Sequence, residues 1–280
     1  MDIRCIALDL DRTTLNKEGR LSEKNRRAIE AVIAAGIHVV IASGRAFDTL
    51  PADICSVSGI EYAITGNGAA IYRMTTGECI RRYLLSEGAV KAVMNATTRD
   101  PVTYEAFING AAYAECAYIE DPVRFGATPQ AVEYVRSTRK PVDDIRDFIL
   151  RHSSDLDSMD IVVKDDVWKE EIWRKLEEAT DEIYITSSVK QLVEISDKQC
   201  GKHTGIACVL KDLGLPREAL AAFGDADNDI DMLRFAGCGI AMANASEECR
   251  QAADYVTGHH DEDGLAQALI NILHLIPEDV

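Results

Sequence analysis

Two groups of carboxylates follow short apolar runs near opposite ends of the chain. Asp9-Leu10-Asp11-Arg12-Thr13 comes after the apolar residues 3–8, and Gly224-Asp225-Ala226-Asp227-Asn228-Asp229 comes after residues 220–223. Carboxylates at the ends of buried strands are costly unless they are paired, hydrogen-bonded or bound to a metal. Oxygen ligands with few other donors suit Mg²⁺, which keeps several waters and takes a few carboxylates. The pattern therefore predicts a magnesium site.

Hydroxyl, glycine and cationic residues follow two further apolar runs. Ser43-Gly44-Arg45 comes after residues 37–42, and Gly66-Asn67-Gly68 comes after residues 62–65. Parallel strands deliver the loops at their carboxyl ends to one edge of a sheet, where ligands bind. If the four runs are neighbouring parallel strands, these side chains surround one crevice together with the carboxylates.

A calcium-binding loop is the alternative for the second acidic run. From Asp225, acids occupy the first, third and fifth positions of such a loop. The sixth position is Ile230, where a calcium loop needs glycine, and the twelfth is Ala236, where it needs a bidentate glutamate. We therefore reject the calcium loop.

The elements around these runs alternate between strand and helix. Ser22 is suited to cap a helix that ends near Gly36, between the apolar runs 3–8 and 37–42. The chain returns to this style after residue 201, with helical patterns at 201–213, 228–235 and from 264 onward. Alternating β and α elements predict a doubly wound, Rossmann-like parallel sheet with helices on both faces.

The middle of the chain has a different pattern, typical of a mixed α+β module. Residues 102–107 and 111–116 flank Asn109-Gly110, which is a strong hairpin signal. Helical stretches at 87–96 and 167–179 accompany strand candidates at 159–164, 182–188 and 191–195. We expect residues 1–83 and 195–280 to form the α/β core, and residues 84–194 to form an inserted α+β cap.

Composition narrows the class of function. The chain has 280 residues and a formal net charge of −17, and we find no basic stripe that would bind nucleic acid or an anionic membrane. Its eight cysteines form no CxxC pair, which indicates reduced thiols in a cytoplasmic protein. We see no signal peptide, and no apolar run approaches the ~18 residues of a membrane span.

The motifs in order resemble those of the haloacid dehalogenase superfamily of Mg²⁺-dependent phosphotransferases, and within it the Cof-type phosphatases, which carry a large α+β cap. Residues 9–13 match the first motif, DxDxT, and Ser43 matches the second. Lys202 after Gly201 matches the third, and residues 224–229 match the fourth. Residues 67–69, 239–245 and 261–264 are softer echoes of the same pattern. The resemblance covers the whole predicted core.

The resemblance implies a role for each of these residues. Asp9 would be the nucleophile that forms an aspartyl-phosphate, and Asp11 would protonate the leaving group and then activate water. The metal would be held by Asp9, Asp225 and the backbone carbonyl of Asp11, with Asp229 as a ligand or acting through water. The expected phosphate-binding residues are Thr13, Ser43, Gly44, Lys202 and Asn228, and Arg45 is a candidate for substrate contact.

Several of these residues also have a simpler interpretation. Thr13 could be only a turn hydroxyl, Ser43 a helix cap and Lys202 a solvated lysine. Arg45 could pair with an acid instead of reaching substrate. Asn67 more often serves a turn than a substrate.

The expected function is therefore a cytoplasmic Mg²⁺-dependent phosphatase of small phosphorylated metabolites, with sugar phosphates the favoured class. The cap would close over the core and distinguish leaving groups. A phosphomutase of the same superfamily and a non-catalytic protein that binds phosphorylated metabolites are the alternatives. The resemblance implies a glycine beside the phosphate pocket at the position that Arg12 occupies, so this residue departs from the pattern of many relatives.

Overall fold

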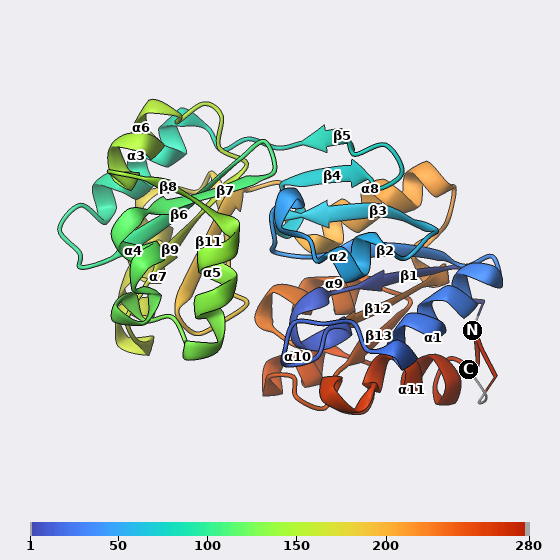
Figure 1. Cartoon of the computed structure of the whole chain (residues 1–280). Helices are drawn as coiled ribbons and strands as arrows, with labels where there is room; N and C mark the ends of the chain where they lie inside the picture. The colour runs from blue at the N-terminus through green and yellow to red at the C-terminus, as the bar shows by residue number, and fades with distance from the viewer. Residues whose placement is uncertain (1, 278–280) are drawn as a thin grey trace. The chain divides into compact units, whose positions relative to one another are not determined.

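The computed structural model describes residues 2–277, which form two compact units. The first, here called the core unit, comprises residues up to 44, residues 50–81 and residues from 201 onward. The second, here called the cap unit, comprises residues 45–49 and 82–200. Each unit contains its own β-sheet (Figure 1).

The core unit is built on an eight-stranded sheet with the order β14-β13-β12-β1-β2-β3-β4-β5. The strands from β14 to β3 are parallel, and β4 runs antiparallel to β3. Their bounds are β1 Cys5–Leu8, β2 His38–Ala42, β3 Ile60–Thr65, β4 Ala70–Arg73, β5 Glu78–Arg82, β12 Leu220–Gly224, β13 Cys238–Ala241 and β14 Tyr255–Val256. The predicted doubly wound parallel sheet is confirmed, and β4 and β5 extend it as a hairpin that the sequence did not reveal.

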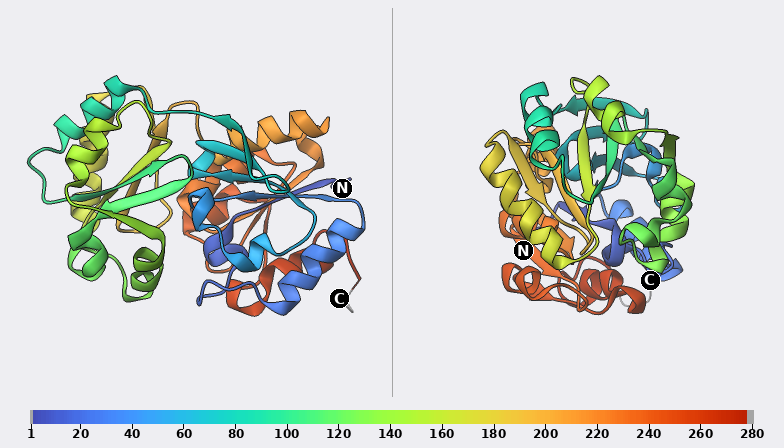
Figure 2. Two further views of the ribbon diagram at one scale, coloured as in Figure 1. Left: turned by 45° about the horizontal axis from the view of Figure 1, so that its top comes forward. Right: turned by 90° about the vertical axis from the view of Figure 1, so that its left-hand side faces the viewer.

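Helices cover both faces of the core sheet, as Figures 1 and 2 show. The helices α1 (Glu23–Ala34) and α11 (Gly264–Asn271) pack together on one face. The helices α8 (Lys202–Leu213), α9 (Ile230–Phe235) and α10 (Glu247–Ala252) pack on the other face, and the short α2 spans Ala52–Cys55. Within residues 2–277, no helix is both long and apolar enough to cross a membrane.

Buried apolar strands and local capping explain why these elements form. All four residues of β1 are buried, as expected for a strand with helices on both sides. The hydroxyl of Ser22 accepts a hydrogen bond from the N–H of Asn25 and so caps α1. Gly36 follows the end of α1 with a φ of 82°, the left-handed conformation that commonly ends a helix.

The cap unit contains a six-stranded sheet with the order β10-β11-β9-β6-β7-β8. Its strands are antiparallel except for the parallel pair β7 and β8. Their bounds are β6 Thr103–Ile108, β7 Ala111–Glu115, β8 Arg139–Val142, β9 Ser158–Val162, β10 Ile183–Thr186 and β11 Leu192–Asp197. Asn109 and Gly110 both have positive φ, which is the conformation that the predicted two-residue hairpin requires.

The helices of the cap unit also divide between the two faces of its sheet. The first face packs against α3 (Glu87–Ala96), α6 (Ile145–Arg151) and α7 (Asp166–Ala179), with Tyr104, Met159 and Ile161 among the buried residues. The short helices α4 (Cys116–Glu120) and α5 (Val132–Thr138) pack near Val162 on the other face. The mixed α+β character expected for the inserted module is present.

We propose the two compact units as the two domains. The sequence placed the boundaries at residues 83/84 and 194/195, whereas the units divide at 81/82 and 200/201. The second boundary is later because β11 continues to Asp197 and pairs with β9 and β10 in the cap sheet. The segment 45–49 also clusters with the cap unit, which the sequence did not indicate.

Candidate active site

The candidate site lies at the carboxyl ends of two neighbouring parallel strands of the core sheet. Strands β1 and β12 pair in register from Cys5 opposite Leu220 to Leu8 opposite Phe223. The N–H of Asp9 continues this ladder by donating to the carbonyl of Phe223 at 3.1 Å. Asp9 directly follows β1, and Asp225 directly follows Gly224, the last residue of β12. The parallel pairing of the two strands therefore brings together carboxylates more than 200 residues apart in sequence.

Three buried carboxylates gather at this edge. Asp9, Asp225 and Asp229 are 5%, 4% and 0% exposed, and one carboxylate oxygen of each lies within 4.8 Å of the others. The strand-end pattern of the sequence therefore predicted the right neighbours. Such a cluster of negative charge needs a counter-charge or protonation.

Lys202 supplies part of that counter-charge from the first turn of α8. Its Nζ donates to Oδ1 of Asp9 at 2.6 Å and to Oδ1 of Asp229 at 2.7 Å, and its side chain is completely buried. The solvated-lysine interpretation is therefore wrong. The start of α8 is fixed by the N–H of Gly201, which donates to the carbonyl of Asn67 at 2.8 Å.

Asp229 is held by donors on both of its oxygens. While Oδ1 accepts from Lys202, Oδ2 accepts from the backbone N–H groups of Asp225 at 2.9 Å and Ala226 at 3.1 Å. Asp9 differs, because its Oδ2 accepts no hydrogen bond from the described residues. The two carboxylates therefore differ in their hydrogen bonding. Asp229 holds the loop after β12 in place, whereas Asp9 has one carboxylate oxygen available for a ligand or for chemistry.

The pKa values of Asp9, Asp225 and Lys202 are all raised by their surroundings. Burial, together with the neighbouring Asp229 and Asp225, raises the pKa of Asp9 well above its usual value, although Lys202 opposes the shift. Burial and Asp229 raise the pKa of Asp225 to about 7, against the opposing effects of Arg12, Thr13 and Lys202. Burial alone would lower the pKa of Lys202, but the carboxylates of Asp229 and Asp9 outweigh it and raise that pKa. Lys202 is therefore charged at neutral pH.

The donor set fits a hard divalent cation. Three buried carboxylates face one buried ammonium, so a net negative charge is left at the cluster. Burial is the largest cause of the raised pKa values of Asp9 and Asp225, and the charge of Asp229 adds to it. Carboxylate oxygens without imidazole or thiolate among them are the ligands that Mg²⁺ takes.

Asp225 is positioned by two side chains. The hydroxyl of Thr13, fully buried, donates to Oδ1 of Asp225 at 3.1 Å. The amide of Asn244 donates to Oδ2 of Asp225 at 3.3 Å, and its own oxygen accepts the N–H of His260 at 3.1 Å. Sequence reasoning assigned no role to Asn244, although it lies in the 239–245 motif echo.

Asn228, expected at the phosphate, contacts another polar residue of the same edge. Its amide donates to Oδ1 of Asn67 at 3.0 Å, and both residues are 4% exposed. Asn67 has a φ of 52°, so it serves a tight turn and also contacts this predicted site residue. The loop after β3 therefore borders the candidate site.

The remaining motif residues lie near the same strand ends. Ser43 is buried directly after β2, its N–H donates to the carbonyl of Ile64 at 2.9 Å, and its carbonyl accepts from Asn67 at 3.1 Å. Gly44 follows and is partly exposed. Asp11 is exposed, two residues after Asp9, in the tight turn Leu10–Thr14.

Arg45, the candidate for substrate contact, has contacts within the cap unit. The residue belongs to the cap unit, where its guanidinium stacks over the ring of Tyr134 at 4.4 Å and donates to the carbonyl of Thr49 at 3.0 Å. The carbonyl contact and the aromatic stacking anchor its side chain within that unit. Its suggested role toward substrate stays a prediction.

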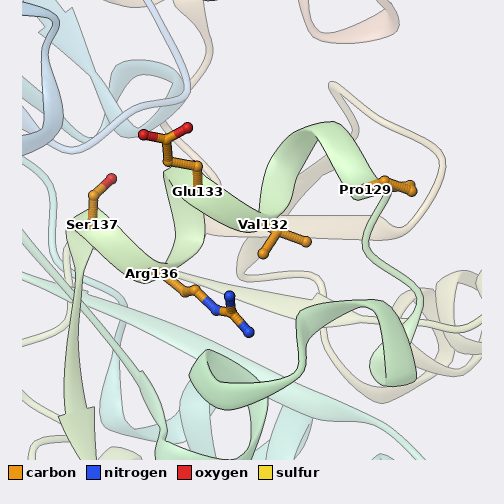
Figure 3. Close-up of a pocket in the computed structure, with 5 residues that line it drawn as sticks. All are labelled: Pro129, Val132, Glu133, Arg136 and Ser137. Carbon is orange, nitrogen blue, oxygen red and sulfur yellow. The ribbon is translucent and has the colours of Figure 1, made fainter.

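A hollow of about 580 Å³ lies beside α5 in the cap unit (Figure 3). Its lining residues are Pro129, Val132, Glu133, Arg136 and Ser137. The guanidinium of Arg136 donates to the carbonyls of Ile119 and Glu120, so this cation already has a structural role. The hollow contains none of the predicted site residues, and we assign it no function.

Comparison with known proteins shows similarity over nearly the full length of the chain. The family described as haloacid dehalogenase-like hydrolase matches residues 6–269. Phosphatase YwpJ of Bacillus subtilis (strain 168) is 29% identical over 97% of this chain and 100% of its own. The 5-amino-6-(5-phospho-D-ribitylamino)uracil phosphatase YcsE of the same organism is 28% identical over 96% of this chain and 95% of its own. The fold is similar to that of a haloacid dehalogenase-like hydrolase from B. subtilis, with a TM-score of 0.83, 25% identity, and coverage of 96% of this chain and 100% of that one.

Proposed function

The chain belongs to the haloacid dehalogenase-like hydrolases and is a phosphatase, and from its site we propose that it hydrolyses small phosphomonoesters with Mg²⁺ through an aspartyl-phosphate on Asp9. The observation that carries the proposal is the setting of Asp9. This carboxylate is buried, with Oδ1 held by Lys202 and with Asp225 and Asp229 beside it. Its Oδ2 has no hydrogen-bond donor among the described residues and is suited to attack.

In the first half of the reaction, Oδ2 of Asp9 attacks the phosphorus of the ester. A bond forms between Asp9 and phosphorus, and the bond from phosphorus to the ester oxygen breaks. Lys202 holds Asp9 in place and opposes the negative charge that would repel a phosphate dianion. A metal ion held by Asp9, Asp225 and the Asp11 carbonyl would, when bound, neutralise charge on the phosphoryl group.

Asp11 is the residue that we assign to proton transfer. Its side chain gives a proton to the departing oxygen, which leaves as an alcohol. The resulting carboxylate then takes a proton from a water molecule that attacks phosphorus and releases inorganic phosphate, so Asp9 is regenerated. The exposure of Asp11, compared with the burial of Asp9, fits a residue that exchanges protons with water and leaving group.

The phosphoryl oxygens would be bound by Ser43, Lys202 and backbone N–H groups near Leu10 and Gly44. We assign Thr13 and Asn228 more indirect roles than the sequence suggested. Thr13 donates to Asp225, and Asn228 donates to Asn67, so both fix the surroundings of the phosphate. Asp229, with both oxygens already engaged, would act on the metal through water.

The substrate class that we propose is small phosphorylated metabolites, with sugar phosphates first. The B. subtilis relative named for 5-amino-6-(5-phospho-D-ribitylamino)uracil supports a phosphorylated polyol chain as one form of leaving group. The net charge of −17 disfavours large polyanions such as nucleic acid.

The test is phosphate release from a panel of sugar phosphates, polyol phosphates, nucleotides and phosphorylated cofactors, with Mg²⁺ and with chelator. We expect release that needs both the metal and Asp9, with Asp9→Asn as the blank. Asp11→Asn should lose turnover of alkyl phosphates severely while the fold is retained, as circular dichroism would show. Substantial release by Asp9→Asn would rule out Asp9 as the nucleophile.

The phosphomutase alternative is tested in the same assay. A mutase would isomerise a sugar phosphate in the presence of a bisphosphate and release little free phosphate. Isomerised product without phosphate release would overturn the hydrolase assignment but leave the role of Asp9 intact.

A further inference from the structure

Arg12 stands next to the site in a conformation that a residue with a side chain rarely adopts. Its φ is 61° and its ψ is 14°, which is the left-handed region. Its carbonyl accepts a hydrogen bond at 2.9 Å from the amide of Asn244, the same amide that lies 3.3 Å from Oδ2 of Asp225. The backbone of Arg12 is therefore tied to a carboxylate of the candidate metal site.

The guanidinium of Arg12 forms a long, partly exposed ion pair with Asp225. Its Nε lies 3.7 Å from Oδ2 of Asp225, which is longer than a hydrogen bond, and its side chain is 56% exposed. Within residues 2–277, the guanidinium makes no hydrogen bond. Arg12 thus places a permanent charge and a planar fork of N–H donors on the solvent side of Asp225.

The site already has an inner cation for the phosphoryl group that is transferred. Lys202 is completely buried and contacts Asp9, the proposed nucleophile, whereas Arg12 is exposed. A buried cation meets the part of a substrate that enters the site, and an exposed one meets the part that remains outside. That outer part is the leaving group.

We infer that Arg12 binds a second anionic group on the leaving group, a carboxylate or another phosphate, so that the preferred substrates are acidic phosphomonoesters. This inference rests on the proposed phosphatase function. A planar guanidinium makes paired hydrogen bonds with carboxylates and phosphates, which a single ammonium cannot match in geometry. The local cation also offsets the repulsion that a chain of net charge −17 exerts on such substrates.

The test compares pairs of substrates that differ in the second anion. We would measure kcat and KM for 3-phosphoglycerate against glycerol 3-phosphate, and for fructose 1,6-bisphosphate against fructose 6-phosphate. The enzymes are the wild type, Arg12→Gln, which removes the charge but keeps a polar side chain, and Arg12→Lys, which keeps the charge. Arg27→Gln removes the same charge from an exposed position on α1, where Arg27 pairs with Glu23, and is the matched control.

We expect Arg12→Gln to lower kcat/KM for the acidic member of each pair by about tenfold, mainly through KM, and to leave the other member within about twofold. Arg12→Lys should recover only part of the preference, and Arg27→Gln should match the wild type. The preference of the wild type should shrink as ionic strength rises.

Two results would overturn the inference. One is an equal loss on both members of each pair, which would show that Arg12 acts on the common phosphoryl group. The other is unchanged substrate preference with a changed Mg²⁺ affinity, measured by calorimetry without substrate, which would show that Arg12 only offsets the charge of Asp225. Failure of the phosphatase proposal is separable, because the wild type would then release no phosphate from any member.

Discussion

Lys202 shows how one residue can serve both the stability and the chemistry of the site. Its ammonium lies between the buried carboxylates of Asp9 and Asp229, at 2.6 and 2.7 Å. A buried ion pair with excellent geometry contributes little net stability, but removal of one partner leaves the other charges buried and uncompensated. Lys202 therefore orients the proposed nucleophile, and its removal would also destabilise the core unit.

We predict that Lys202→Met abolishes phosphate release and lowers the free energy of unfolding by about 3 kcal/mol in the presence of chelator. Addition of Mg²⁺ should restore part of this stability, because a cation at the carboxylates replaces the lost charge. Denaturant unfolding with chelator and with Mg²⁺ measures both effects. Lys211→Met, an exposed position on the same helix, is the control and should change little. A Lys202→Met protein as stable in chelator as the wild type would contradict this electrostatic account.

At the scale of elements, the site depends on a close approach between the loop after β3 and the start of α8. A Cβ built on Gly68 would lie 2.4 Å from the carbonyl oxygen of Gly201 and 2.7 Å from its nitrogen. Gly201 directly precedes Lys202, and its N–H is held by the carbonyl of Asn67. The absence of a side chain at Gly68 therefore allows Gly201, and with it the start of α8 at Lys202, to approach the loop after β3.

We predict that Gly68→Ala lowers the free energy of unfolding by about 3 kcal/mol and kcat more than tenfold. Gly77→Ala is the matched control, because Gly77 also has a positive φ, of 68°, but has open space around its Cβ position. It should cost only the conformational strain, about 1 kcal/mol, and leave kcat unchanged. Equal effects of the two substitutions would show that strain alone, and not the contact with Gly201, limits position 68.

The cap sheet carries a buried row of acids across three adjacent strands. Asp160 on β9 lies opposite Glu105 on β6 and opposite Glu194 on β11, and all three are less than 7% exposed. Arg139 pairs with Glu105. Burial, followed by the charges of Glu194 and Glu105, raises the pKa of Asp160 well above its usual value. The folded protein therefore binds a proton at Asp160 that the unfolded chain releases.

The charge on buried Asp160 lowers the free energy of unfolding. This loss is absent below the pKa that Asp160 has in the unfolded chain, and it grows as the pH rises toward the raised pKa of the folded state. Asp160→Asn removes the titration and keeps the shape, so it should stabilise the protein by about 1 kcal/mol or more at pH 8 and by little near pH 4. Urea unfolding across this pH range measures the difference, with the exposed Asp143→Asn as control. A gain that does not depend on pH would contradict the assignment.

The elements differ in how far the sequence predicts them. The apolar runs of β1, β2 and β12 identify parallel strands, and parallel strands place Asp9, Ser43 and Asp225 at one edge because their carboxyl ends coincide. The acidic row of the cap was not predictable, because the sequence does not show which residues of β6, β9 and β11 lie opposite one another. Register there depends on turns and crossovers that act over long distances in sequence.

Individual side chains of the site also differ in how far the sequence predicts them. The closeness of Asp9 and Asp225 follows from local patterns, whereas the part played by Lys202 was given only by resemblance to a family. The contact of Asn244 with Asp225 depends on the path of the chain after β13, which local sequence does not specify. Arg45, which sequence placed among the strand-end residues, stacks on Tyr134 in the cap unit because residues 45–49 belong there.

At the scale of the whole molecule, two compact units divide the chain, and the charges that we assign to catalysis come from the core unit. Its sheet gathers Asp9, Lys202, Asp225 and Asp229 from segments at both ends of the sequence. Family membership extends over residues 6–269 and therefore includes both units. We propose that one of these residues, Asp9, carries the phosphoryl group during turnover.

The most direct test is to trap that phosphoryl group. Asp11→Asn would be mixed with p-nitrophenyl phosphate and Mg²⁺, because this leaving group departs without a general acid and the missing base slows hydrolysis. After an acid quench and proteolysis, mass spectrometry should find one phosphoryl group on the peptide that contains Asp9, and borohydride should reduce that acyl phosphate to homoserine at position 9. The double variant that also carries Asp9→Asn should show neither. A phosphoryl group on Ser43 or Thr13, or nitrophenol release without any phosphorylated peptide, would contradict the account.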